Sequence, residues 1–296
     1  MGSRRNFVKG AVAALIMAAG TFSSSLFAAQ HSQADELKLA FIPQENPEKL
    51  LGDIKVITKW LSDQTGVEVK GFVTIDHAAA VEALRNGDAD ISFMGALPFV
   101  LAEKEIGAKP LLSEIYKGAA SYTGRIFVRK DSGIKSLADL KGKTIAFADP
   151  ISESGYMYPL NLFVEAGLFA EPSDAGNFFD RSYFAGGYQQ SMQAMAAGLV
   201  DAAGSSQYAD LLLTPQQQSE VISIAESEPI PSHMVIARNG LDAGLEAKFV
   251  EAMLALNTAE NKQYLAYIYG PEGYVKSNTD DYDGVRALAR RYGLMK

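Results

Sequence analysis

Short apolar runs alternate with amphipathic stretches along the chain, and this pattern predicts alternating strands and helices. Runs with β-branched or aromatic residues between turn residues indicate buried strands, whereas apolar residues at helical spacing, such as Leu50, Ile54 and Leu61, indicate helices. In the first part of the chain we expect strands at 37–42, 67–75 and 89–95, and helices at 47–65 and 77–84. This order predicts a mostly parallel sheet covered by helices, with the ligand at the carboxyl ends of the strands.

The alternation returns further along the chain. Extended runs at 109–117 and 122–130 are joined by a turn and carry the chain into a second unit. There we expect strands at 144–148, 181–185 and 201–204 and helices at 154–166 and 189–197; after residue 237 the rest is helical, at 245–256, 260–269 and 284–292. The fold class is therefore α/β with two lobes, 35–121 plus 237–296 and 122–236, each a mixed, mostly parallel sheet flanked by helices. Two crossings between them predict a two-strand hinge.

Residues 1–34 have the pattern of an export signal. Arg4, Arg5 and Lys9 precede an apolar run at 11–19 that is too short to span a bilayer, and small residues lie before Asp35. The paired arginines favour the twin-arginine route over an ordinary secretory signal that happens to carry two arginines. We therefore expect a periplasmic protein.

Charge and composition narrow the possible partners. The net charge is −8, and it becomes −11 when the three cations of the export segment leave. This acidity argues against nucleic acid as a partner, although it does not exclude a small anion in a cleft, where local amides dominate. The chain has no cysteine, so thiolate catalysis and Cys-ligated metals are excluded.

A turn rich in hydroxyl groups follows the strand predicted at 144–148. Asp149 or Ser152 can cap the next helix, and Pro150 suits its first turn. Ser152, Ser154 and the unpaired N–H groups of that turn form a site for a compact, oxygen-rich ligand. The alternative is that these residues only stabilise the start of the helix, and the turn alone leaves both possibilities open.

The turn Ser152-Glu153-Ser154-Gly155-Tyr156, with the stretch 124–142 upstream, resembles the periplasmic phosphonate/phosphite-binding proteins of ABC importers. The resemblance in pattern runs from about Leu37 to the last helices. It implies a bilobal, type II periplasmic binding protein that acts as a monomer, closes on a small ligand and delivers it to a membrane ABC permease. It implies no cofactor and no catalytic residue.

The resemblance also implies where the ligand is held. Ser152, Ser154 and Gly155 match the family's Ser-Thr-Ser-Gly turn, in which hydroxyls and amides hold the phosphorus oxygens. His77 and Met94 stand where that family has Tyr, and Tyr188 stands where aminoalkylphosphonate binders have His. The implied ligand-binding set is Ser152, Glu153, Ser154, Gly155, Tyr188, His77, Met94, Tyr122, Tyr208 and His233.

Two of these positions limit the ligand. The carboxylates that hold an amino group in aminoalkylphosphonate binders fall at about Tyr208 and His233, and neither is acidic. A buried ammonium would lack its paired charge, so a smaller or uncharged ligand is favoured. We expect phosphite, a simple phosphonate or a related oxoacid.

Glu153 stands where the family has Thr and complicates this interpretation. An ionised carboxylate about 4 Å from an oxyanion would cost about 4 kcal/mol at an effective dielectric near 20. Glu153 therefore points away, or is protonated, or the ligand carries a proton or is not an anion. The outer face of the first helical turn, where a carboxylate favours the helix dipole, is the expected position.

Other functions remain as alternatives. The motifs of serine hydrolases, zinc proteases and phosphate loops are absent, so we do not expect an enzyme. His77, Glu153, Tyr188, Tyr208 and His233 together resemble an iron or zinc site, which makes a metal-binding protein of the same fold the main alternative. A ligand sensor that reports to a membrane kinase is another.

Overall fold

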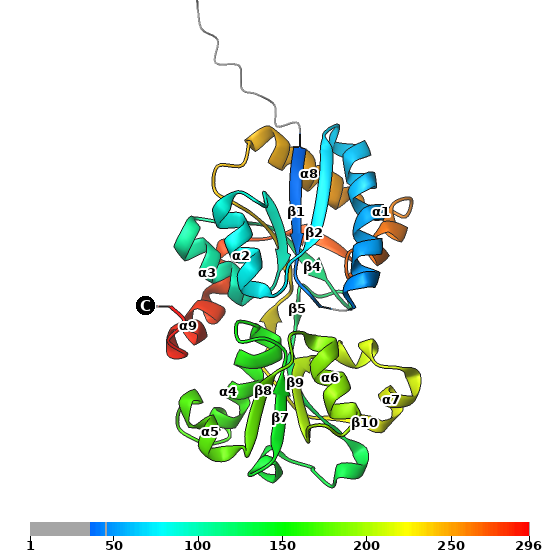
Figure 1. Ribbon diagram of the computed structural model, residues 1–296. Coiled ribbons are helices and arrows are strands. Elements are labelled where there is room, and N and C mark those ends of the chain that lie inside the picture. Colours follow the sequence, from blue (N-terminus) through cyan, green and yellow to red (C-terminus); the bar gives the residue numbers. More distant parts are fainter. Residues whose placement is uncertain (1–35, 45, 296) are drawn as a thin grey trace, which may run out of the picture. The chain divides into compact units, whose positions relative to one another are not determined.

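The computed structural model describes residues 36–44 and 46–295, which form one compact unit. Two β-sheets, each packed between helices, make up most of this unit (Figure 1). The α/β, bilobal class expected from the sequence is confirmed. The predicted export segment, 1–34, lies outside the described residues.

The first sheet has six strands in the order β13-β4-β12-β3-β1-β2. Strands β2 and β3 flank β1 and run parallel to it, while β12, β4 and β13 add antiparallel pairs. The strands are β1 (Glu36–Phe41), β2 (Glu68–Val73), β3 (Ile91–Met94), β4 (Lys109–Ile115), β12 (Met234–Ala237) and β13 (Gly273–Lys276).

Helices cover both faces of this sheet. Helices α1 (Pro47–Thr65) and α8 (Ala243–Ala255) share one apolar cluster with Leu37, Leu39 and Phe41 of β1. Helices α2 (His77–Asn86), α3 (Ala96–Ile106) and α9 (Asp283–Arg291) share another with Ala40 on the opposite face. At residues 39–41 of β1, which are buried between these two clusters, the sequence is a continuous apolar run.

Local capping sets the ends of these helices. The Asn46 side chain accepts N–H groups of the first turn of α1, and Gly66 ends that helix in the left-handed conformation. The Asp76 carboxylate accepts the Ala79 N–H at 2.7 Å, so α2 begins at His77 as predicted. These caps fix the loops at the carboxyl ends of β1 and β2.

The second sheet has five strands in the order β10-β6-β9-β7-β8. Its strands are β6 (Gly124–Arg129), β7 (Thr144–Phe147), β8 (Arg181–Phe184), β9 (Ala202–Ser206) and β10 (Val221–Glu226). Helices α4 (Tyr158–Glu165) and α5 (Ala175–Phe178) share an apolar cluster with Ile145 and Phe147, while α6 (Tyr188–Ala196) packs on the other face beside Ala146. Helix α7 (Pro215–Glu220) precedes β10.

Single turns of other helix types connect these elements. A π-helical turn, Glu153–Met157, precedes α4. The 3₁₀ turns are Lys130–Ser132, Leu137–Leu140, Pro172–Asp174, Ala209–Leu212, Lys262–Tyr267 and Thr279–Tyr282.

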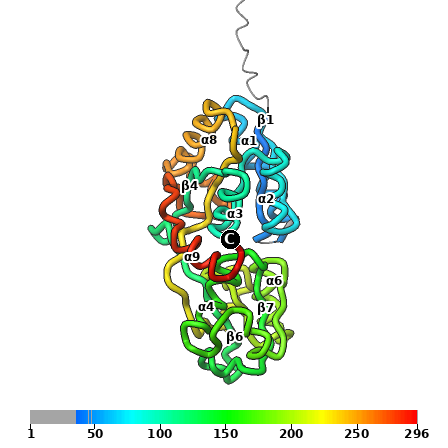
Figure 2. Tube along the Cα trace, turned by 90° about the vertical axis from the view of Figure 1, so that its left-hand side faces the viewer, coloured from blue at the N-terminus to red at the C-terminus, as the bar shows by residue number. Residues whose placement is uncertain are grey.

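Two short strands connect the sheets. β5 (Ser121–Tyr122) leads from β4 to β6, and β11 (Ile230–Pro231) leads from β10 to β12; the two pair antiparallel. This is the expected two-strand hinge. A further contact lies at the end of helix α9, which is red in Figure 2. The hydroxyl of Tyr292, the residue after this helix, donates a hydrogen bond to the Met157 carbonyl at 2.9 Å.

The structure corrects several expectations. Parallel pairs do not predominate, because antiparallel strands complete both sheets. The boundary expected at residues 236/237 is too late, since β12 already belongs to the first sheet. Helix α3 was not predicted, and β13 lies in the region expected to be all helical. The helix expected at 154–166 is a π-turn followed by α4.

Candidate functional site

The turn after β7 is held tightly by its own backbone and by Ser152. The Ser152 hydroxyl accepts the Gly155 N–H at 3.0 Å, and the Ala148 N–H donates to the Gly155 carbonyl at 3.1 Å. A Cβ at Gly155 would lie 2.5 Å from Ala148 Cβ and 2.8 Å from Ser152 Oγ. The position therefore requires glycine, and Ser152 does cap the turn, as the sequence allowed.

Hydroxyl groups from three elements converge beside this turn. The Tyr188 hydroxyl, at the start of α6, lies 2.9 Å from Ser154 Oγ and 3.3 Å from Ser152 Oγ. The Tyr122 hydroxyl, on the hinge strand β5, lies 3.0 Å from Ser154 Oγ. Burial raises the pKa values of Tyr122 and Tyr188, so both phenols stay neutral and can donate or accept hydrogen bonds.

Glu153 is not on the outer face of the helix start, and this expectation was wrong. Its side chain is fully buried, and its carboxylate accepts the Tyr122 hydroxyl at 2.7 Å and the Leu97 N–H at 3.3 Å. Leu97 lies in the first turn of α3, so a carboxylate of one lobe binds a helix N-terminus of the other. The π-helical turn directs the side chain inward, which helical periodicity could not predict.

His233, just before β12, completes this cluster. Its Nε2 lies 3.2 Å from the Tyr188 hydroxyl and 3.9 Å from Glu153 Oε1. Burial lowers the pKa of His233 to about 4, against the opposing effect of Glu153. The imidazole is therefore neutral near pH 7 and takes part as a hydrogen-bonding group.

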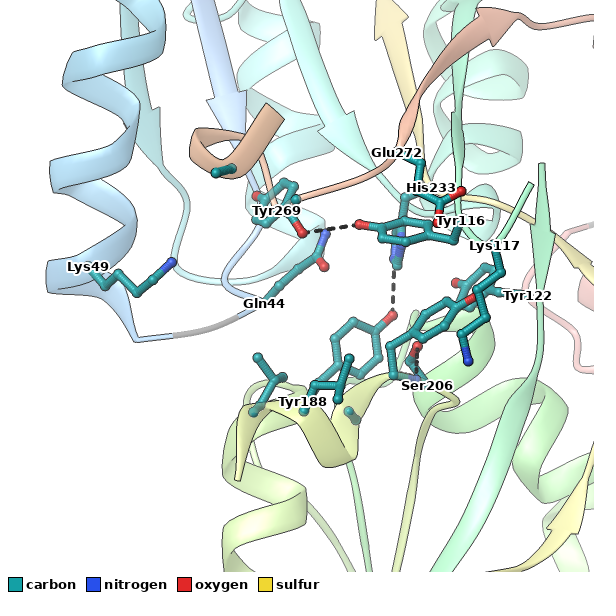
Figure 3. A pocket seen from close by; sticks show the side chains of 16 residues that line it. Gln44, Lys49, Tyr116, Lys117, Tyr122, Tyr188, Ser206, His233, Tyr269 and Glu272 are labelled. Carbon is teal, nitrogen blue, oxygen red and sulfur yellow. Dashed lines mark hydrogen bonds between the residues drawn. The ribbon is translucent and has the colours of Figure 1, made fainter. Parts of the chain in front are cut away.

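A cavity of about 480 Å³ opens beside the cluster, with tyrosines on most sides (Figure 3). Four of the predicted residues, Tyr122, Tyr188, Tyr208 and His233, line it. The rest of its lining is Gln44, Lys49, Tyr116, Lys117, Ser206, Ala209, Leu211, Leu212, Ala266, Tyr269, Gly270 and Glu272.

The other predicted residues lie outside this cavity lining. Ser152, Glu153, Ser154 and Gly155 are buried behind Tyr122 and Tyr188. His77, at the start of α2, is buried, and its Nδ1 has no hydrogen-bond partner among the described residues.

Met94 and Tyr208 have mainly packing contacts in this conformation. Met94 is fully buried at the end of β3, in the apolar cluster with α2 and α3. The Tyr208 ring packs against the Tyr116 ring, with centroids 5.0 Å apart, and Lys117 Nζ lies 5.4 Å from the Tyr208 ring centroid.

Sequence reasoning missed several residues of the site. Tyr116 follows β4, and its hydroxyl donates to the Tyr269 carbonyl at 3.2 Å, while the Tyr269 hydroxyl donates to the Ile42 carbonyl at 2.8 Å. The position of Tyr116 at the end of a strand was a usable signal. Leu97 contributes its backbone N–H group, so its residue type gave no signal in the sequence.

Two further observations concern a metal site and a membrane-spanning helix. Among residues 36–44 and 46–295, no group of three or more His, Cys, Asp or Glu side chains is arranged to hold a metal ion. The same ranges contain no helix with the length and apolar character needed to cross a bilayer.

The comparisons with known proteins agree on one family. The family described as "ABC transporter, phosphonate, periplasmic substrate-binding protein" matches residues 39–282. The phosphate-import protein PhnD of Mycolicibacterium smegmatis is 34% identical over 173 residues, which cover 57% of this chain and 54% of the relative, so the match spans about half its length. A probable ABC transporter phosphite binding protein, PhnD1 of Prochlorococcus marinus, is 24% identical over 93% of this chain and 94% of its own.

Solved structures agree with the fold. The binding protein component of an ABC phosphonate transporter from Pseudomonas aeruginosa has a TM-score of 0.76 at 25% identity, covering 86% of this chain and 85% of its own. Prochlorococcus PhnD1 in complex with methylphosphonate has a TM-score of 0.78 at 20% identity, covering 88% and 98%. The family match spans most of the chain, and the chain therefore belongs to the family of periplasmic phosphonate-binding proteins of ABC transporters.

Proposed function

We propose that this protein binds phosphite or a simple phosphonate between its lobes and delivers it, as a monomer, to the permease of an ABC importer. The observation that carries the proposal is the convergence of Ser152, Ser154 and Tyr188 on one buried point beside the cavity. The three hydroxyls supply the hydrogen-bond donors that a phosphorus oxyanion needs. Because these donors are neutral, they hold the oxyanion without a charged side chain as its fixed partner.

The hydroxyls bond to one another in this conformation, so a ligand has to exchange these bonds for its own. The hinge strands β5 and β11 allow that exchange, because opening the lobes separates the Glu153 carboxylate of the second lobe from the Leu97 N–H of the first. A ligand that bridges the lobes favours the closed arrangement and shifts the population towards it.

The relative PhnD1 supports the choice of ligand class. It is described as a probable phosphite binding protein, and its structure was solved in complex with methylphosphonate. Isothermal titration of protein purified without added ligand, with phosphite, methylphosphonate and phosphate in turn, tests it. We expect saturable one-to-one binding of phosphite or methylphosphonate. Absence of binding to every phosphorus oxyanion would refute the proposal.

We also propose that the protein reaches the periplasm by the twin-arginine route. Arg4 and Arg5, followed by Phe7 and Lys9, support this. The double variant Arg4→Lys with Arg5→Lys should accumulate in the cytoplasm, while Lys9→Arg should be exported normally. Normal periplasmic accumulation of the double variant would contradict this route.

A further inference from the structure

The Glu153 carboxylate occupies the position between the lobes where donor groups meet. It accepts the Tyr122 hydroxyl at 2.7 Å, and Tyr122 also lies 3.0 Å from Ser154 Oγ. It also accepts the Leu97 N–H at the N-terminus of α3, whose N-cap residue, Gly95, has no side chain to cap the helix. Any oxyanion bound at Ser154 would therefore lie near this carboxylate, which Tyr122 links to Ser154 Oγ.

The groups around Glu153 do not neutralise a second negative charge. The titratable side chains that face it are Tyr122 of β5, Tyr188 of α6, Tyr158 of α4, Tyr282 before α9 and His233 before β12. His77 of α2 lies close enough to His233 to lower its pKa further. The tyrosines are neutral and His233 is neutral near pH 7, so none of the described side chains that face Glu153 is a cation that could pair with a dianion.

A ligand that carries a hydroxyl on its acid group avoids this repulsion. A carboxylate offers about four lone-pair sites, and Tyr122 and Leu97 use two of them, so the remaining sites can accept a P–OH group. A hydrogen bond from a hydroxyl to a carboxylate is stronger than one between two neutral groups, because its acceptor is charged. The organic substituent of such a ligand would lie in the tyrosine cavity, which Tyr122 and Tyr188 also line.

We propose that Glu153 is a specificity-determining residue that selects oxyanions in their singly protonated form, with the ligand hydroxyl donating to its carboxylate. This rests on the proposed function and names the ligand form for the same site. Phosphite and simple phosphonates can carry that proton. Sulfate and alkylsulfonates are fully deprotonated near neutral pH and offer only acceptors, so Glu153 excludes them.

The test measures the proton directly. Calorimetric titration with methylphosphonate between pH 5.5 and 8.5, in pairs of buffers with different ionisation heats, gives both the dissociation constant and the number of protons taken up. Above the second ionisation of the ligand, wild-type affinity should fall about tenfold per pH unit, with proton uptake approaching one per ligand. Methanesulfonate should not bind.

Two variants change the residue in different ways. Glu153→Gln removes the charge at nearly constant shape, and Glu153→Thr restores the residue that the family has at this turn. In both, the proton uptake and the pH slope should vanish, and methanesulfonate affinity should rise at least about tenfold. Glu251→Gln, an exposed acid on α8, is the matched control and should keep the wild-type slope.

Buried Glu114, with a pKa of about 8, titrates in the same range but is unchanged in all four proteins, so the differences between them isolate Glu153. Wild-type binding with no proton uptake across this range would overturn the proposal while leaving the proposed function intact. Retention of the full pH slope in a folded Glu153→Gln protein would also overturn it. If wild type and both variants bind no phosphorus oxyanion at any pH, the proposed function fails as well.

Discussion

The hydroxyl of Tyr188 lies 3.2 Å from Nε2 of His233, so a side chain at the start of α6 meets one on the segment that leads back into the first sheet. Both residues also line the tyrosine cavity (Figure 3). The contact therefore links the hydroxyl cluster, the hinge and the cavity.

Replacing Tyr188 with Phe tests whether this hydroxyl serves the ligand or only the fold. The variant loses contacts to Ser152, Ser154 and His233, and one neutral hydrogen bond contributes about 0.5–1.5 kcal/mol. We expect methylphosphonate affinity to fall about tenfold in calorimetry. Tyr183→Phe, on exposed strand β8, should bind normally. A lower melting temperature with unchanged affinity would assign the hydroxyl a structural role alone.

Ser152 and Ser154 should behave differently from each other. Ser152 Oγ accepts the Gly155 N–H, whereas Ser154 Oγ contacts the hydroxyls of Tyr122 and Tyr188. Ser152→Ala should therefore lower the free energy of unfolding by about 1 kcal/mol, as loss of an N-cap does. Ser154→Ala should mainly weaken ligand binding, by about tenfold or more.

Urea unfolding and calorimetry on each single variant separate the two effects. If Ser154→Ala binds the ligand as tightly as wild type, the hydroxyls of this turn serve the fold and the anchor lies elsewhere. Equal losses of stability and affinity in both variants would contradict the division of roles.

The sequence predicted the elements whose signals are local. Helix α1 begins and ends at residues 47 and 65, as its apolar spacing predicted, and α2 begins after its Asp76 cap. Strand β13 and helix α3 were missed, because β13 is short and α3 lies next to a buried strand with little periodic contrast. Apolar runs buried on both sides do not show which type of element they form.

The site was predictable only in part, for a different physical reason. The turn with Ser152, Ser154 and Gly155 could be found because its residue types and their order indicate a capped helix start with free hydroxyls, and its role in ligand binding stays a prediction. The inward direction of Glu153 depends on a π-helical turn, and its partner Leu97 contributes a backbone N–H group. The direction of the Glu153 side chain and the choice of Leu97 as its partner both depend on tertiary geometry, so residue types alone do not predict them.

His233 should make the protein less stable in acid. Burial holds its pKa at about 4, below the ordinary value of 6.5. Between these values the unfolded chain binds a proton that the folded chain does not. The free energy of unfolding therefore falls as the pH drops through this window, by at most about 1.4 kcal/mol per pH unit.

The variant His233→Gln keeps a polar side chain and removes this titration. Urea unfolding at pH 7, 6 and 5 should show wild type losing more stability than the variant at each step. Parallel curves for the two proteins would contradict the assignment. The comparison is internal, so other titrating groups cancel.

Glu114 should act in the opposite direction. It is buried on β4, its Oε2 has no hydrogen-bond partner among the described residues, and burial raises its pKa from 4.5 to about 8. Between these values the folded chain keeps a proton that the unfolded chain releases. The free energy of unfolding therefore falls as the pH rises from 4.5 through 8, by at most about 1.4 kcal/mol per pH unit.

Glu114→Gln should be more stable than wild type at pH 8, and the difference should shrink towards pH 5. Glu272→Gln, an exposed acid that follows the 3₁₀ turn Lys262–Tyr267, is the control and should parallel wild type. A stability difference that does not depend on pH would mean that Glu114 does not titrate in this range.

Gly95 and Glu153 should be coupled sterically across the lobes. A Cβ at Gly95 would lie 2.6 Å from Cδ of Glu153, although the backbone of Gly95, with φ of −82°, would itself accept alanine. Gly95→Ala should therefore displace the Glu153 carboxylate from the N-terminus of α3. In the Glu153→Ala background, the same substitution should cost much less.

A double-mutant cycle on the free energy of unfolding measures this coupling, and contacts of this kind give about 0.5–3 kcal/mol. Gly52→Ala, in α1 where nothing lies within 4 Å of the added Cβ, should be neutral or slightly stabilising and shows that alanine itself does no harm. Additive effects of Gly95→Ala and Glu153→Ala would mean that the carboxylate does not rest on α3. In that case the Leu97 N–H would not hold the Glu153 carboxylate beside Ser154, and the selection of protonated ligands would lose its structural basis.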